Sequence, residues 1–144
     1  MEISRNHKTR LSVSMEVLEN TICDVERIIK SSNQEKTMSE TVNNLPPWER
    51  ALILKCIEEI KGSINYVAQN LDLNKRKEET RSLILGAMTI ERVSLEEIKS
   101  KGLRGYGEVP DDLREFLDPQ VDKMMALVDE ICQIAGSKPT KKRA

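Results

Sequence analysis

The chain has 144 residues, of which 33% are charged and 3% aromatic, and its formal net charge is −1. This length can bury an apolar core without disulfides or metals. So few aromatic residues argue against a β-sandwich or β-barrel. The near-zero net charge argues against a protein whose main task is to coat nucleic acid or an acidic membrane.

The cysteines and the hydropathy pattern predict a cytoplasmic protein that is not associated with membranes. Three cysteines cannot all pair within one chain, which favours reduced thiols and a reducing compartment. No apolar run approaches the roughly 18 residues needed to cross a bilayer, and the polar N-terminus lacks a signal-peptide core.

Two helices are predicted in the first half of the chain. The first covers residues 9–31, and the second begins at residues 45–49, where two prolines suit a first helical turn. In both, apolar residues recur at alternating spacings of four and three, which places them in one stripe along a helix. The polar residues 31–44 between them predict a mobile connection, long enough to hold additional local structure. The two stripes consist of Leu11, Met15, Leu18, Ile22, Val25 and Ile29, and of Ile53, Ile57, Ile60, Ile64, Val67 and Leu71.

A third helix is predicted over residues 75–101, with a broader apolar stripe that Glu91 interrupts and Gly86 weakens. We expect one long helix, kinked or split, rather than a strand followed by a helix. Ser94 and Glu97 could form a capping box that starts a new helix.

A fourth helical stretch begins at Pro110, and Pro119 either kinks it or separates a short extra turn near residues 110–118 from the longer part over 119–135. Residues 74–104 hold eight basic and five acidic residues, whereas residues 105–137 hold two and eight. The third and fourth helices are therefore predicted to be antiparallel neighbours. The fourth stripe consists of Leu117, Val121, Met124, Val128, Ile131 and Ala135.

Each apolar stripe needs a partner to cover it, and four helices of similar length can cover one another. The sequence therefore predicts an all-α fold, an antiparallel four-helix bundle, as a single domain over residues 9–136. Residues 1–8 are expected to be a flexible N-terminus and residues 137–144 a flexible basic tail.

No catalytic or metal-binding constellation is evident. His7 is the only histidine, which excludes bundles that need a mid-helix histidine or paired Glu-x-x-His motifs. Cys23, Cys56 and Cys132 could form a thiolate metal site or a redox sensor, but small apolar residues at the core margin are the favoured interpretation. Neighbouring carboxylates fall on predicted polar faces. We therefore expect no enzyme activity, no cofactor and no metal.

Seven residues are candidates for binding a partner. Lys75, Arg76 and Lys77 would occupy the first turn of the third helix if Asn74 caps it, against the helix dipole. An anionic partner would explain this arrangement, as would chance placement on a tolerant surface, which we favour. Arg81 and the basic tail could extend the patch.

The other three candidates lie elsewhere in the chain. Arg104 and Tyr106 sit at the tip of a glycine-rich interhelical turn over residues 102–107. Trp48 either closes the bundle end as a hydrophobic staple, which we favour, or is an exposed interface anchor.

These features predict a non-enzymatic protein–protein interaction module: an adaptor, subunit or regulator that binds another protein or itself, with a homodimer as one form. The alternative is a nucleic-acid-associated regulatory protein that uses a basic patch at the start of the third helix and the C-terminal tail.

Overall fold

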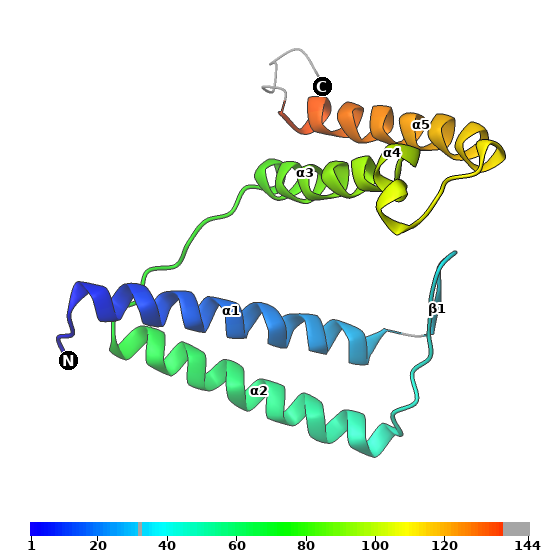
Figure 1. Ribbon diagram of the computed structural model, residues 1–144. Coiled ribbons are helices and arrows are strands. Elements are labelled where there is room, and N and C mark those ends of the chain that lie inside the picture. Colours follow the sequence, from blue (N-terminus) through cyan, green and yellow to red (C-terminus); the bar gives the residue numbers. More distant parts are fainter. Residues whose placement is uncertain (32, 137–144) are drawn as a thin grey trace, which may run out of the picture. The chain divides into compact units, whose positions relative to one another are not determined.

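The computed structural model describes residues 1–31 and 33–136, and most of them are helical (Figure 1). Contacts divide the chain into two compact units, residues 1–75 and residues 76 onward. The first unit contains α1 (Arg5–Lys30) and α2 (Pro47–Asn70), joined through the short strands β1 (Gln34–Glu35) and β2 (Glu40–Thr41). The second contains α3 (Thr80–Ile98), α4 (Ser100–Leu103), the 3-10 turn η1 (Arg104–Tyr106) and α5 (Asp111–Gly136). The all-α class is confirmed, whereas the four-helix bundle and its single domain stay predictions.

α1 begins at Arg5, four residues before the predicted start. Ser4 caps it, because its Oγ accepts a hydrogen bond from the backbone N–H of His7 at 3.1 Å. The connection to α2, which is long enough for local structure, contains an antiparallel pair of strands, with Gln34 opposite Thr41 and Glu35 opposite Glu40.

Asn43 ties the end of α1 to the start of α2. Its Nδ2 donates to the carbonyl oxygens of Ile29 and Ser31, and its Oδ1 accepts from the N–H of Leu45. The Asn43 N–H donates to Oδ1 of Asn33 at 2.7 Å. These bonds satisfy carbonyl groups that a helix end leaves without partners. α2 then starts at Pro47, with proline in its first turn as predicted.

The start of the third helix was predicted wrongly. α3 begins at Thr80, so Lys75, Arg76 and Lys77 precede it in a segment without helix or strand. Glu79 occupies the N-cap position, and acidic residues at a helix N-terminus interact favourably with its dipole, whereas three cations would not. α3 continues through Glu91 and Ser94 without interruption, so the capping box at Ser94 does not form.

The chain breaks after Ile98 rather than at Ser94. Lys99 has an extended backbone with ψ 157° and separates α3 from the short α4. The third predicted helix is thus split, near its end. Asp118 of α5 holds the new start, because its two carboxylate oxygens accept from the N–H and Oγ of Ser100 at 2.9 and 2.7 Å.

The fourth predicted helix is one continuous α5 that includes Pro119, so the separate turn near residues 110–118 was wrong. Proline removes one backbone hydrogen bond from a helix interior. Packing on both sides of Pro119 supports the helix there: Val121 is fully buried, and Asp118 is anchored to Ser100.

The antiparallel pairing of the third and fourth predicted helices is confirmed by contacts near both ends of α3. Nη1 of Arg81, at the start of α3, donates to the carbonyl oxygens of Ile134 and Ala135 at the end of α5. Near the other end of α3, Lys99 Nζ lies 2.8 Å from an Asp122 carboxylate oxygen. Opposite charge on the two helices therefore pairs across their interface.

The buried stripe of α5 differs in part from the predicted one. Val121, Met125 and Ala135 are buried against α3, whereas Met124 and Ile131 are 41% and 42% exposed. α5 carries apolar residues on two adjacent stripes, and sequence spacing alone could not decide which stripe faces α3.

Candidate protein-interaction groove

α1 and α2 pack through the two stripes that the sequence predicts. Ile29 of α1 and Ile57 and Ile64 of α2 are buried between the helices, and the other members of the stripes are only half-buried or exposed. Two helices packed against each other can bury only the residues along the line where they meet. The flanks of both stripes therefore remain open on the surface of this unit.

An apolar groove of about 580 Å³ lies along one flank, between α1 and α2. Five stripe residues form its floor and walls, so residues that the sequence assigns to a closed core line an open groove instead. The lining consists of Met15, Leu18, Cys56, Glu59, Ile60, Ser63, Ile64 and Val67.

The polar members of the groove were missed as site residues. Cys56, Glu59 and Ser63 each immediately precede a stripe residue of α2, and all three are exposed. Successive helical residues are rotated by about 100°, so these three share one side of the contact line. Sequence spacing places these three on one side of the stripe, but only the structure shows that this side is open. Glu59 is the one charged side chain in the groove lining.

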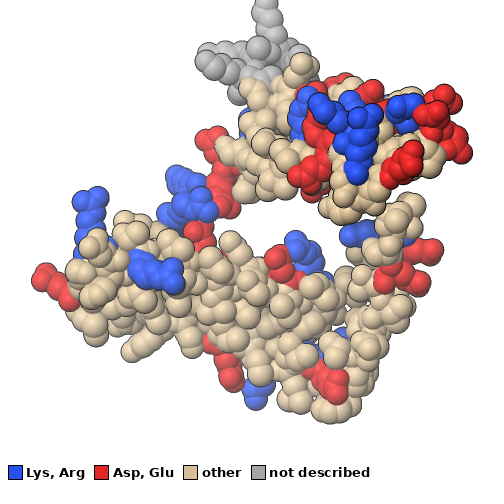
Figure 2. All heavy atoms as spheres, viewed as in Figure 1, with Lys and Arg blue, Asp and Glu red and all other residues tan. Residues whose placement is uncertain are grey.

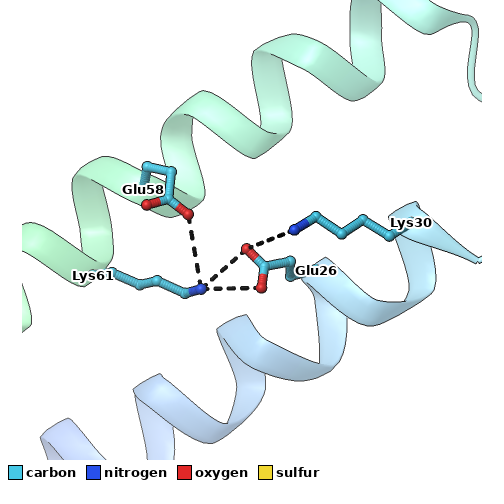
Figure 3. A network of polar contacts seen from close by, with 4 residues as sticks. All are labelled: Glu26, Lys30, Glu58 and Lys61. Atoms are coloured by element: carbon cyan, nitrogen blue, oxygen red, sulfur yellow. Dashed lines mark hydrogen bonds and ion pairs between the residues drawn. The ribbon is translucent and has the colours of Figure 1, made fainter.

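The opposite flank of α1 and α2 carries a network of ion pairs (Figure 3). Lys61 Nζ lies 3.0 Å from both carboxylate oxygens of Glu26, and 3.8 Å from Glu58. Lys30 Nζ also lies 3.8 Å from Glu26. The hydrogen bond from Lys61 lowers the pKa of Glu26, and the same bond raises the pKa of Lys61. The α1–α2 hairpin therefore presents a charged flank and a largely apolar flank.

The second unit also has a charged flank, on which basic and acidic side chains lie side by side in Figure 2. Arg92 Nε lies 3.1 Å from an Asp129 carboxylate oxygen, and Lys99 pairs with Asp122. The bond to Asp122 raises the pKa of Lys99. Hydrogen bonds from the backbone and side chain of Ser100 lower the pKa of Asp118.

The candidate partner-binding residues are not gathered into one site. Trp48 is 64% exposed near the start of α2, which does not fit the favoured staple. Lys75 follows the other end of that helix, about 36 Å away at 1.5 Å per residue. Arg81 lies in the first turn of α3, whereas Arg104 and Tyr106 belong to η1 beyond the far end of α3.

Two of the candidate cations already have partners within the chain. Arg76 pairs with Glu78, and Arg81 caps the C-terminal end of α5. Tyr106 is almost fully exposed. The basic tail, residues 137–144, lies outside the described residues.

The three cysteine thiols are not bonded to one another. Cys23, Cys56 and Cys132 are free, and the first two are exposed rather than at a core margin. Within residues 1–31 and 33–136, no group of three or more His, Cys, Asp or Glu side chains is placed to hold a metal ion.

Among the described helices, none is both long enough and apolar enough to cross a membrane. The chain matches no family model, no curated protein and no solved structure.

Proposed function

We propose that this chain is a non-enzymatic, cytoplasmic protein–protein interaction module, and that its α1–α2 groove binds an amphipathic helix of another protein. The groove is the observation that carries this proposal. Grooves lined by apolar side chains bind helices through residues at i, i+3 or i+4, and i+7.

The dimensions and chemistry of the groove support a helical ligand. Its lining on α2 extends from Cys56 to Val67, about 16 Å at 1.5 Å per residue, which matches three turns of a docked helix. Met15 provides a flexible wall that adapts to different apolar side chains. Glu59 favours a ligand with a Lys or Arg beside its apolar ridge.

We propose the antiparallel four-helix bundle for the complex, in which further helices pack on α1 and α2. A two-helix hairpin with one apolar flank completes a bundle when further helices cover that flank. Binding would then bury stripe residues that the isolated hairpin leaves open, and such burial is the main source of affinity in helix docking.

The nucleic-acid alternative has lost part of its basis. The patch expected at the start of the third helix now consists of Lys75, Arg76 and Lys77 in a non-helical segment, with Arg81 engaged by α5. We therefore retain protein binding as the function that the structure supports better.

Site-specific photocrosslinking tests the groove. A benzoylphenylalanine is placed at Ser63, which lines the groove, or at Asn65, which is also exposed on α2 but lies on the other side of Ile64. In cells, an adduct is expected from position 63 alone, and peptide mapping is expected to locate it in an amphipathic helix. A synthetic peptide of that segment is then titrated against the purified chain.

The matched pair for the titration is Ser63→Arg, which fills the groove, and Asn65→Arg, which does not. We expect Ser63→Arg to weaken peptide binding at least about tenfold, and Asn65→Arg to leave it unchanged. Equal crosslinking from both positions, or equal affinities of the two variants, would refute the groove as the binding site.

A further inference from the structure

α5 carries a second apolar stripe that α3 does not cover. Its members are exposed, and each stands one residue before a member of the row that packs on α3. They recur along nearly the whole helix, with Gln120 as the polar exception. The stripe consists of Phe116, Met124, Leu127, Ile131 and Ile134.

α3 has apolar residues in the equivalent position. Ile84, Ala87 and Ile98 are exposed and stand one residue before Leu85, Met88 and Lys99, which are half-buried toward α5. In an antiparallel pair, equal rotation from the contact line places residues of both helices on the same open face. The ion pairs of Asp122 and Asp129 use residues one position after the contact row, so they lie on the other face.

The open side of the α3–α5 pair, which carries this apolar face, is large enough to hold a stable dimer together. α3 has 19 residues and α5 has 26, so the helices are about 28 and 39 Å long and each about 10 Å wide. The flat footprint is roughly 670 Å², and two copies would bury roughly 1,300 Å² in total, within the range of specific interfaces.

The width of the face argues for a two-helix partner. A single helix about 10 Å wide would cover only half of it. A second α3–α5 hairpin has the required width and the same apolar character. Turned by a twofold axis parallel to the helices, it places each α3 on the partner's α5 in antiparallel orientation, as in a four-helix bundle.

We propose that the α3–α5 face docks a second copy of itself, so that the chain is a homodimer whose four central helices form an antiparallel bundle. This deepens the proposed interaction function by naming one partner of the module. The net charge of −1 per chain adds little repulsion between copies. Glu91, one residue before Arg92, is the acidic side chain that α3 brings to the face, and its desolvation opposes association.

Light scattering on the full chain tests the dimer across concentrations of about 1 to 100 µM. The wild type is expected at twice the 16.4 kDa chain mass. Leu127→Lys, on the face, is expected to give the chain mass. Val93→Lys is the matched control, because Val93 is similarly exposed, 57% against 50%, but follows Arg92 and points away from the face. Glu91→Gln is expected to tighten the dimer about fivefold.

Circular dichroism of both lysine variants shows whether the helices persist. A wild type at the chain mass throughout overturns the dimer, as does a dimer that Leu127→Lys leaves intact, or that Val93→Lys disrupts equally. A monomeric wild type that Leu127→Lys destabilises more than Val93→Lys also overturns it, because the face is then covered within one chain. Peptide binding by the groove of the Leu127→Lys protein is measured separately, so that the two proposals fail independently.

Discussion

Gly102 occupies a position at which the backbone leaves no room for a side chain. α4 folds back against the end of α3, and a Cβ on Gly102 would lie 2.1 Å from the carbonyl oxygen of Glu97. The neighbour is backbone rather than a flexible side chain, so it cannot move aside without disturbing α3. The sequence shows a glycine-rich turn here, but only the structure shows which of its glycines is required for space.

We expect Gly102→Ala to destabilise the chain by about 2 kcal/mol or more, since the new methyl group forces the two helix ends apart. Gly86→Ala is the control: nothing lies within 4 Å of its added Cβ in the middle of α3, so it should stabilise by about 0.5–1 kcal/mol. Urea unfolding monitored by circular dichroism measures both. Changes of the same sign in the free energies of unfolding of the two variants would contradict this explanation.

At the scale of elements, apolar spacing located α1, α2 and α5 because their stripes are regular. It failed at the start of α3. Lys75, Arg76 and Lys77 are residue types that helices accept, but as cations they are unfavourable in a first helical turn because of the helix dipole. It also failed at the end of α3, where the break at Lys99 depends on Asp118, a residue 18 positions beyond Ser100. Capping by a distant side chain leaves no local sequence signal.

The bond between Asp118 and Ser100 predicts acid sensitivity. The pKa of Asp118 is lowered by the Ser100 hydrogen bonds, so the unfolded chain binds a proton at this carboxyl more readily than the folded chain. The contribution of the Asp118 carboxylate to the free energy of unfolding is present above about pH 4 and is lost as the pH falls through the lowered pKa. Asp118→Asn should therefore be less stable than the wild type at pH 7, with a smaller difference at pH 3.

Urea midpoints at the two pH values check this, with Glu130→Gln as the control on the same helix, since Glu130 is exposed. The control should follow the wild type at both pH values. A difference between wild type and Asp118→Asn that stays constant with pH would show that the Ser100 contact does not depend on the carboxylate charge.

At the scale of the molecule, the chain consists of two hairpin units, each with ion pairs on one flank and apolar residues on the other. Residues 73–79, which connect α2 to α3, contain neither helix nor strand, and residues 74–79 are exposed. Three consecutive basic residues, Lys75 to Lys77, lie within this segment.

Limited trypsin digestion should therefore make its first cut within residues 1–136 at Lys75, Arg76 or Lys77. Proteases bind extended, accessible chain, and basic residues within packed helices must first unfold locally. Mass spectrometry of early time points identifies the products, and each isolated fragment should remain helical. Replacing all three residues with Gln should remove this cut. First cleavage inside α1 or α5 would contradict the two-unit organisation.

The sequence by itself determined the all-α class, the approximate helices and the antiparallel pairing of the third with the fourth predicted helix, because these depend on local spacing and on charge along a segment. The tertiary structure decided which stripe of α5 faces α3, where α3 ends, and that five predicted core residues of α1 and α2 line a groove. Helical period restricts a residue to one side of its own helix. Whether another helix covers that side depends on how distant segments pack, and spacing within one segment carries no information about that.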